Sequence, residues 1–449
     1  MILKERYHYI KRIAALQIAV MMMLSIVACM EPTGGVTEES KITIRFEWWG
    51  TDNRNEYTQE LLDLYTKLHP NIVFEANPTG WDGYFDRLST QAATGAMPDI
   101  VQMDYMYLNT YSKNNSLADM TKYIEDGTID TSNIDVDVMN MGVVDGELTG
   151  MVCSTTTMAV GYNMSVLNDA GVNLPTKDWT WEDFVNMSAE VTKVTGKAGA
   201  VVSSGAVGNT TLLNYWVRQH GEQLYSDDGT ELGFTDESII AGYLDLWNNM
   251  INNNLYPDPD EFAQIESLGQ SGGPVATGEA AFCFDWDNYA TSVAEYNDTI
   301  GMITPPLAEG SDNQALWVKP GQLLSISEKS TVKKEAAEFI NWFINSEEAN
   351  YIINAERGIP VSSKIRDVLL ESGNLSKQQA EMFHYTEKEK NLIGTVVAPE
   401  PCGVMEINKL FMNAGNSVFH GQQTAQEAAR EFMEAANKVL AKNKPKKYK

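Results

Sequence analysis

The chain has 449 residues, of which 43% are hydrophobic, so it can bury sizeable cores, and its length predicts two or three domains. Its formal net charge of −28 argues against nucleic acid as a partner, because an acidic surface repels phosphate groups. The five histidines are scattered singly and the four cysteines lack metal-ligand spacing, so no metal or other cofactor is expected.

Residues 1–28 have the pattern of a lipoprotein signal peptide. A segment with four basic side chains precedes an apolar run over residues 13–27, and Ala28 stands directly before Cys29. The apolar run is shorter than the roughly 20 residues that span a membrane. We therefore expect cleavage before Cys29 and a lipid on its thiol, which would anchor the mature protein to the outer face of a bacterial cell membrane. The alternative is an ordinary cleaved signal in which Cys29 carries no lipid.

The next segments predict a tether and then an α/β fold. Residues 29–40 lack apolar periodicity and contain a Gly-Gly pair, which favours flexible chain. Apolar and polar residues alternate from residue 42 to Trp48, as in a half-buried strand, and helical spacing follows up to residue 68. A strand at 72–74, a helix over about 81–93 and a strand at 100–103 come next. Alternating strands and helices predict a mostly parallel sheet covered by helices on both faces.

Three later segments have helical spacing. Thr180 and Asp183 form a capping box before the first, the second opens near Ser330, and the third covers residues 424–440. The glycine-rich segment 269–274 lacks the Gly-Lys-Ser or Gly-Lys-Thr of a phosphate-binding loop, so it predicts an ordinary loop.

Aromatic side chains recur near strand ends and loops. Sugar rings bind such surfaces because their C–H faces pack on indole and phenol rings, while their hydroxyls need carboxylate, amide or guanidinium partners. For any single tryptophan, a half-buried core position is an equally good interpretation. The candidates for ligand contacts are Trp48, Trp49, Arg54, Trp81, Asp104, Tyr105, Trp216, Asp285, Trp286, Trp317 and Arg357.

Several of these residues belong to motifs that resemble a known family. Residues 46–50, 69–72, 80–84 and 98–100, together with Arg54, closely resemble the start of extracellular solute-binding proteins, family 1, of carbohydrate ABC importers. The resemblance covers nearly the whole mature chain and continues through Gly161-Tyr-Asn163, Trp179-Thr-Trp-Glu-Asp183, Gly278-Glu-Ala-Ala281, Trp286, Glu335-Ala-Ala337 and Arg357-Gly-Ile-Pro360. The first motifs look most like the branch with oligogalacturonide-binding members, but Asp104-Tyr105 replaces the Asn-Trp of those members.

The resemblance implies a periplasmic-binding-protein-like fold, with two hinge-linked α/β lobes and a ligand cleft between them. We expect one lobe from residues 41–153 plus 305–354 and the other from 154–304 plus 355–449. By motif, Trp48, Trp49, Trp81 and Asp104 would face the cleft from the first lobe, and Asp285, Trp286 and Arg357 from the second.

The implied function is capture of a sugar or oligosaccharide, with uronates included, and its delivery to membrane permease subunits. The protein would be a monomer and not an enzyme, tied to the membrane by its lipid. The sequence leaves open which sugar, chain length and linkage it binds, and which permease it serves.

Two other functions remain as alternatives. An exported glycoside hydrolase needs two carboxylates about 5 to 10 Å apart, for which Asp285 and Asp287 are candidates, although no glycosidase motif flanks them. An adhesive lipoprotein would not require cleft aromatics. Calcium sites at 258–261 or 135–137 also remain open. Cys153, Cys283 and Cys402 permit at most one disulfide, and the sequence does not decide whether it forms.

Overall fold

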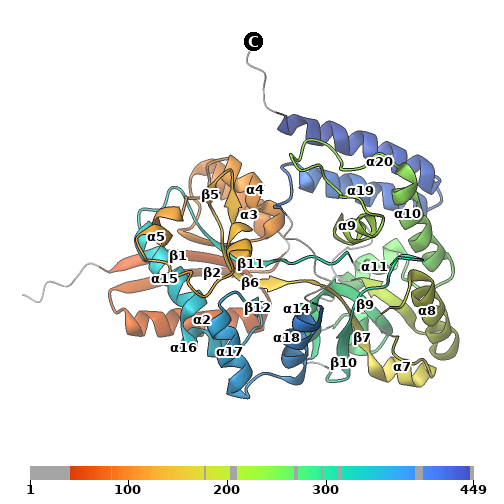
Figure 1. The fold of residues 1–449 in the computed structure, drawn as a ribbon, viewed down its shortest axis with the longest axis horizontal. Coiled ribbons are helices and arrows are strands. Elements are labelled where there is room, and N and C mark those ends of the chain that lie inside the picture. Colours follow the sequence, from red (N-terminus) through yellow and green to blue (C-terminus); the bar gives the residue numbers. More distant parts are fainter. Residues whose placement is uncertain are drawn as a thin grey trace, which may run out of the picture. The chain divides into compact units, whose positions relative to one another are not determined.

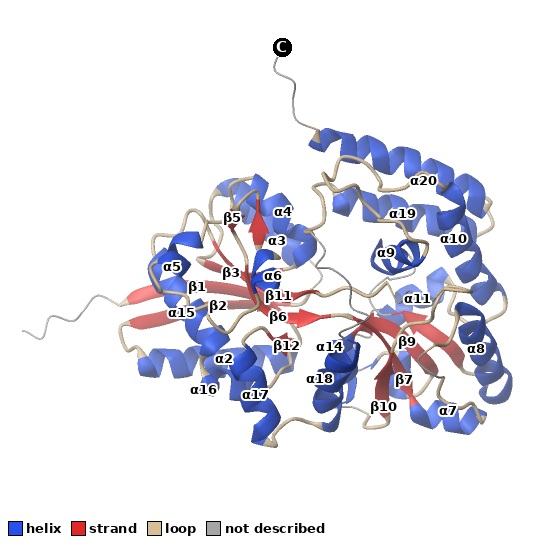
Figure 2. Ribbon diagram, in the orientation of Figure 1, coloured by secondary structure: helices blue, strands red, loops and turns tan. Residues whose placement is uncertain are grey.

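The structure is a computed structural model that describes residues 41–444 except 82, 176–177, 203–209, 267–271, 295–296, 312–314 and 390–397. The predicted signal peptide, the tether and Cys29 lie outside the described residues, as do residues 269–271 of the glycine-rich segment 269–274. Figures 1 and 2 show helices arranged around two main sheets. No helix within the described ranges is both long enough and apolar enough to cross a bilayer.

The first sheet has six strands in the order β12-β6-β11-β3-β1-β2. β1 and β3 are parallel, whereas β11 runs antiparallel to β3 and β6, and β12 runs antiparallel to β6. The strands are β1 (Ile42–Trp49), β2 (Ile72–Thr79), β3 (Ile100–Met103), β6 (Met151–Thr156), β11 (Lys319–Ile326) and β12 (Ile359–Pro360), and a separate hairpin is formed by β4 (Val143–Val144) and β5 (Glu147–Leu148).

The predicted alternation in β1 is confirmed for residues 43–46 and Ile44, Phe46 and Trp48 are all buried, but Glu47 and Trp49 on the other face are buried as well. The ring of Phe46 lies 6.0 Å from that of Phe339, so this face of the strand packs on α15 (Lys333–Asn345). The helices grouped with this sheet by sequence and packing are α2 (Asp52–Leu68), α3 (Tyr84–Thr94), α4 (Tyr105–Lys113), α5 (Thr121–Glu125), α6 (Val136–Asn140), α15 (Lys333–Asn345), α16 (Glu347–Ile353) and α17 (Ser363–Ser372).

The second sheet has four strands in the order β10-β7-β9-β8, of which only β8 and β9 are parallel. Its strands are β7 (Met158–Asn163), β8 (Ala198–Val202), β9 (Ala280–Trp286) and β10 (Ile300–Ile303). The remaining helices are α7 (Met164–Ala170), α8 (Trp181–Thr195), α9 (Thr210–Gln219), α10 (Glu237–Asn252), α11 (Pro259–Glu266), α13 (Pro274–Thr277), α14 (Asp287–Ala294), α18 (Lys377–Glu389), α19 (Val404–Phe419), α20 (Ala425–Leu440) and the 3₁₀ turn η1 (Ala441–Asn443).

The three later helices are confirmed. The Thr180 side chain accepts a hydrogen bond from the Asp183 backbone N–H, and the Asp183 carboxylate accepts from the Thr180 N–H, which completes the capping box of α8. The helix predicted near Ser330 begins at Lys333, and the one predicted over 424–440 is α20. α3 begins at residue 84, later than predicted, because Gly83 has a φ of 76° that favours glycine. Trp81 therefore lies in the loop before α3.

The two-lobed α/β prediction is confirmed, but the expectation of mostly parallel sheets is wrong. β6 leads out of the first sheet, and Thr157 alone joins it to β7 of the second. β11 comes back from the second sheet and pairs beside β6, so the two strands must run in opposite directions. Two neighbouring strands can be parallel when the chain between them crosses over one face of the same sheet. Between β6 and β11, the chain instead passes through the second sheet before it returns.

The strand pairing also moves the last predicted lobe boundary. β12 pairs with β6, so residues 359–360 belong to the first sheet rather than the second lobe. α17 packs against α16 and β12, whereas α18 packs against α14 and β10. The chain thus returns to the second sheet's helices between α17 and α18, and not at residue 355.

Candidate functional site

A cavity of about 1620 Å³ is lined by residues from both sheets. Trp49 ends β1, Asp104 directly follows β3, and Lys319 begins β11. Asp285 and Trp286 end β9 on the other sheet. Because side chains at strand ends are held by the backbone of the sheet, both walls of the cavity carry positioned polar and aromatic groups.

One wall carries a group of packed aromatic rings. Trp81 is 43% exposed, and its ring meets that of Trp49 edge to face at 5.2 Å between centroids. Trp81 also contacts Phe85, on which Tyr107 stacks at 3.6 Å. Trp49 is only 8% exposed. Trp81 is therefore the ring that offers surface to a ligand, and the rings behind it fix its position.

The opposite wall carries two tryptophans with cations above them. The rings of Trp286 and Trp317 are perpendicular, with centroids 5.9 Å apart. Lys319 Nζ lies 4.5 Å from the centroid of Trp286, and the Arg218 guanidinium lies 5.5 Å from that of Trp317. Trp317 is buried, whereas Trp286 is half-buried. Trp286 is thus the more accessible ring of this pair.

Acidic groups surround Lys319 in the cavity. Lys319 Nζ lies 3.7 Å from Asp104 Oδ2. Burial and the nearby Asp104 together raise the pKa of Glu400 to about 7, while Lys319 opposes the shift. Burial also raises the pKa of Asp285 to about 7, against the hydrogen bond from the Trp286 backbone N–H and against Lys319. Glu400 is half-buried as a residue, but its Oε2 is inaccessible to solvent and has no hydrogen-bond partner among the described residues.

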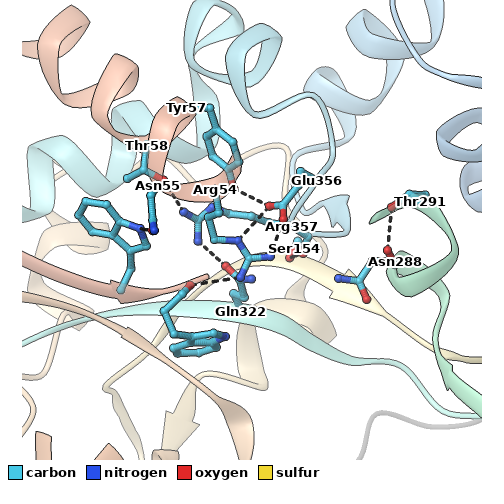
Figure 3. A network of polar contacts seen from close by, with 12 residues as sticks. Arg54, Asn55, Tyr57, Thr58, Ser154, Asn288, Thr291, Gln322, Glu356 and Arg357 are labelled. Atoms are coloured by element: carbon cyan, nitrogen blue, oxygen red, sulfur yellow. Dashed lines mark hydrogen bonds and ion pairs between the residues drawn. The ribbon is translucent and has the colours of Figure 1, made fainter. Parts of the chain in front are cut away.

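Two arginines near the cavity belong to a buried polar network (Figure 3). Arg54 donates to Glu356 through Nη2 at 2.8 Å and Nε at 3.0 Å, and the Tyr57 hydroxyl donates to the same carboxylate at 2.5 Å. Although burial works in the other direction, the Arg54 guanidinium holds the pKa of Glu356 below its usual value. Gly50 makes room for Arg54, since a Cβ at position 50 would lie 2.4 Å from Arg54 Cδ.

Arg357 extends this network into the first sheet. Its Nη2 donates to Thr58 Oγ1 at 2.9 Å, and its Nη1 donates to Gln322 Oε1 at 2.5 Å and to Gln102 Oε1. Its carbonyl oxygen accepts a hydrogen bond from Ser154 on β6. The network therefore fixes the segment around Arg357 to α2 and to the two strands that connect the sheets.

The predicted site residues divide into two groups. Eight of them line the cavity: Trp49, Arg54, Trp81, Asp104, Tyr105, Asp285, Trp286 and Trp317. Trp48 is 1% exposed and donates through Nε1 to Asn55 Oδ1, so it is a core residue. Trp216 packs on Trp181 and donates to the Ile239 carbonyl. Arg357 is 3% exposed and lies with the first sheet, contrary to its implied place on the second lobe.

The structure also adds cavity residues that are not among the predicted candidates. These include Tyr107, Arg218, Lys319 and Glu400. Lys319 stands two residues after the candidate Trp317, and this proximity in sequence could have identified it as a site residue. Glu400 lies between two prolines in a segment without periodicity, and nothing in its sequence neighbourhood marks it.

The residues of the two open calcium segments and the three cysteines all lie within the described ranges. Asp135 caps α6 by accepting from the Asp137 N–H at 2.8 Å, and Asp258 accepts from the Glu261 N–H at 2.8 Å. The described residues contain no cluster of three or more His, Cys, Asp or Glu side chains able to hold a metal ion. All three described cysteines are free thiols.

Because three carboxyl groups are buried, we predict that the free energy of unfolding falls as pH rises from 5 to 8. Burial raises the pKa values of Asp285, Asp287 and Glu400 to about 7, above the roughly 4 of unfolded chain. Between these values the folded protein binds more protons than the unfolded one, so the free energy of unfolding decreases with pH and levels off above about 8. Urea unfolding at several pH values measures this slope.

The matched control for the pH slope is Asp287→Asn. Asp287 is fully buried and accepts a hydrogen bond from Thr156 Oγ1, which an asparagine oxygen can still accept. The variant should have a shallower slope between pH 5 and 8. An unchanged slope would show that Asp287 is not protonated in the folded state.

Comparison with known proteins identifies the family. A sequence model for bacterial extracellular solute-binding proteins matches residues 50–350. The arabinooligosaccharide-binding protein of Bacillus subtilis (strain 168) is 26% identical over 258 residues, which cover 56% of this chain and only 57% of that protein. Among solved structures, an extracellular solute-binding protein family 1 from Alicyclobacillus acidocaldarius is 30% identical, with a TM-score of 0.64, and the alignment covers 89% of this chain and 99% of that one.

A second solved structure supports the fold. The periplasmic oligogalacturonide binding protein from Yersinia enterocolitica, in complex with saturated digalacturonic acid, has a TM-score of 0.80 at 23% identity, and the alignment covers 90% of this chain and 100% of that one. At that identity the likeness concerns the fold alone. The family match, by contrast, covers more than half of the chain. The chain therefore belongs to the bacterial extracellular solute-binding protein family.

Proposed function

We propose that this protein captures a sugar or oligosaccharide in the cavity and delivers it unaltered to the membrane permease of an ABC importer. The carrying observation is the pair of accessible indoles, Trp81 on one wall and Trp286 on the other, with carboxylate and amide side chains on the same walls. Indole faces pack on sugar C–H groups, and the polar side chains bind hydroxyls. The arabinooligosaccharide-binding relative supports this class of ligand.

The hydrolase alternative is weakened by the positions of its two carboxylates. Asp285 lines the cavity, but Asp287 is fully buried and does not line it. A glycosidase needs both groups on opposite sides of the scissile bond. We therefore favour binding without chemistry.

Thermal-shift screening of the mature protein against mono- and oligosaccharides tests the proposed function. A ligand that binds only the folded state raises the melting temperature, by an amount that grows with its concentration relative to Kd. We expect at least one carbohydrate to do so and to be recovered intact by chromatography. Hydrolysis products at a steady turnover would support the glycosidase, and no response to any carbohydrate would overturn the proposal.

Ligand should also draw the two lobes together. The chain crosses between the sheets at Thr157, between β10 and β11, and between α17 and α18, which are the positions available for hinge motion. Small-angle X-ray scattering should show a smaller radius of gyration with saturating ligand than without it. An identical radius of gyration in both samples would argue against closure.

We also propose that Cys29 carries the lipid anchor. The basic segment, the apolar run and Ala28 before Cys29 support it. Cys29→Ser should leave unprocessed precursor or release protein into the medium, and labelling with palmitate should fall to background. Equal labelling of the variant and the wild type would exclude Cys29 as the lipid site.

A further inference from the structure

The cavity wall has more acidic than basic side chains. Among the residues that the structure describes, eight aspartates and glutamates line it, against five lysines and arginines. Three of these acidic side chains, Asp104, Asp285 and Glu400, interact electrostatically with Lys319. We call these three carboxylates the acidic cluster. One cation facing three carboxylates leaves this part of the cavity negative when all are ionised.

Three of the basic side chains that line the cavity are already engaged: Lys319, Arg54 and Arg218. Lys319 lies 3.7 Å from Asp104 Oδ2 and over the Trp286 ring. Arg54 has a two-point ion pair with Glu356. Arg218 donates through Nε to the Ala315 carbonyl at 2.9 Å and lies over Trp317. A carboxylate entering the cavity would have to displace one of these contacts to pair with Lys319, Arg54 or Arg218, although the exposed Lys113 and Lys409 also line the cavity.

Glu400 adds a separate observation. Its segment is held at the cavity by a hydrogen bond from Asn109 Nδ2 to the Glu400 carbonyl at 3.1 Å. Its buried Oε2 has no partner within the described part of the chain. Buried carboxylate oxygens are normally satisfied by donors, and a sugar hydroxyl is a donor whereas an ionised uronate group is not.

We propose that the cavity selects neutral carbohydrates against uronates, with Asp104 and Glu400 as the specificity-determining residues. This inference rests on the proposed function and narrows it. Hydroxyl groups of a neutral sugar donate to Asp104 and Glu400, whereas a uronate would add a further negative charge beside the acidic cluster in a partly buried site, where charges interact more strongly than in water. The Yersinia protein, solved with digalacturonic acid, is therefore a guide to the fold of this chain but not to the charge of its ligand.

Titration calorimetry on matched ligand pairs tests the selectivity. The probes share a skeleton and differ in charge: trigalacturonic acid and its full methyl ester, and cello- and malto-oligosaccharides with and without oxidation of the terminal C6. At pH 8 and low salt, we expect the neutral member of a binding pair to bind at least tenfold more tightly than its acid partner. Tighter binding of the acid members would overturn the inference while supporting carbohydrate binding. No binding of any probe would count against the proposed function itself.

Charge-removing variants assign the selectivity to residues. Asp104→Asn and Glu400→Gln should each shift the neutral-to-acid affinity ratio about tenfold toward the acid, since each keeps the size and the acceptor oxygen of the side chain. Glu190→Gln, which removes an exposed charge paired with Lys193 outside the cavity, is the matched control and should leave the ratio unchanged. An unchanged ratio in both test variants, with folding verified by melting curves, would exclude Asp104 and Glu400 as its source.

Discussion

Replacing Trp286 by alanine should weaken carbohydrate binding by about ten- to a hundred-fold, or roughly 1 to 3 kcal/mol. The ring is half-buried at the end of β9, stands perpendicular to Trp317, and has Lys319 above it. Removing it deletes the stacking surface and the cation's aromatic partner together. Titration calorimetry with the carbohydrate found by thermal-shift screening measures the loss.

Trp286→Phe is the matched control for that loss. A phenyl ring keeps a flat apolar surface, so this variant should recover most of the affinity. Both variants should fold, because the ring lies at the cavity and not at the centre of the core. Full affinity in the alanine variant would exclude Trp286 as a ligand contact.

Trp48→Ala should have the opposite profile, with a large loss of stability and little loss of intrinsic affinity. Trp48 is 1% exposed, packs on Phe46 with centroids 5.0 Å apart, and donates to Asn55. Removing a buried tryptophan leaves a cavity and costs about 3 to 5 kcal/mol of unfolding free energy. Denaturant unfolding measures this loss, and calorimetry at a temperature where the variant is folded measures the affinity.

Two further variants separate packing from hydrogen bonding at Trp48. Trp48→Phe should recover part of the stability because a phenyl ring fills much of the space, and Asn55→Ala should have a smaller effect because it removes only the hydrogen-bond acceptor and a few atoms. A Trp48→Ala protein with normal stability and much weaker sugar binding would place this residue in the ligand site after all.

Much of the fold follows from local sequence patterns. The period of two in β1 correctly buries Ile44, Phe46 and Trp48, and the capping box correctly starts α8. These signals come from neighbouring residues, so they need no knowledge of distant contacts. The direction of β11 could not be predicted in this way. It depends on where the chain returns from the other sheet, and no local pattern encodes that.

The candidate site was predictable only in part, for a related reason. Trp81 and Trp286 line the cavity as expected from their motifs. Arg54 also lines it, but its guanidinium is paired with Glu356, 302 residues away in sequence. Arg357 is likewise held by Thr58 and Gln102. A sequence shows that an arginine stands near aromatic residues, but not that its charge already has a partner.

A crystal structure of the protein with the carbohydrate found by thermal-shift screening tests the central claim most directly. We expect an intact sugar in the cavity, with a ring stacked on Trp286 or Trp81 and a hydroxyl within hydrogen-bond distance of Asp104 or Glu400. A sugar bound elsewhere on the surface, or cleaved in the cavity, would contradict the account.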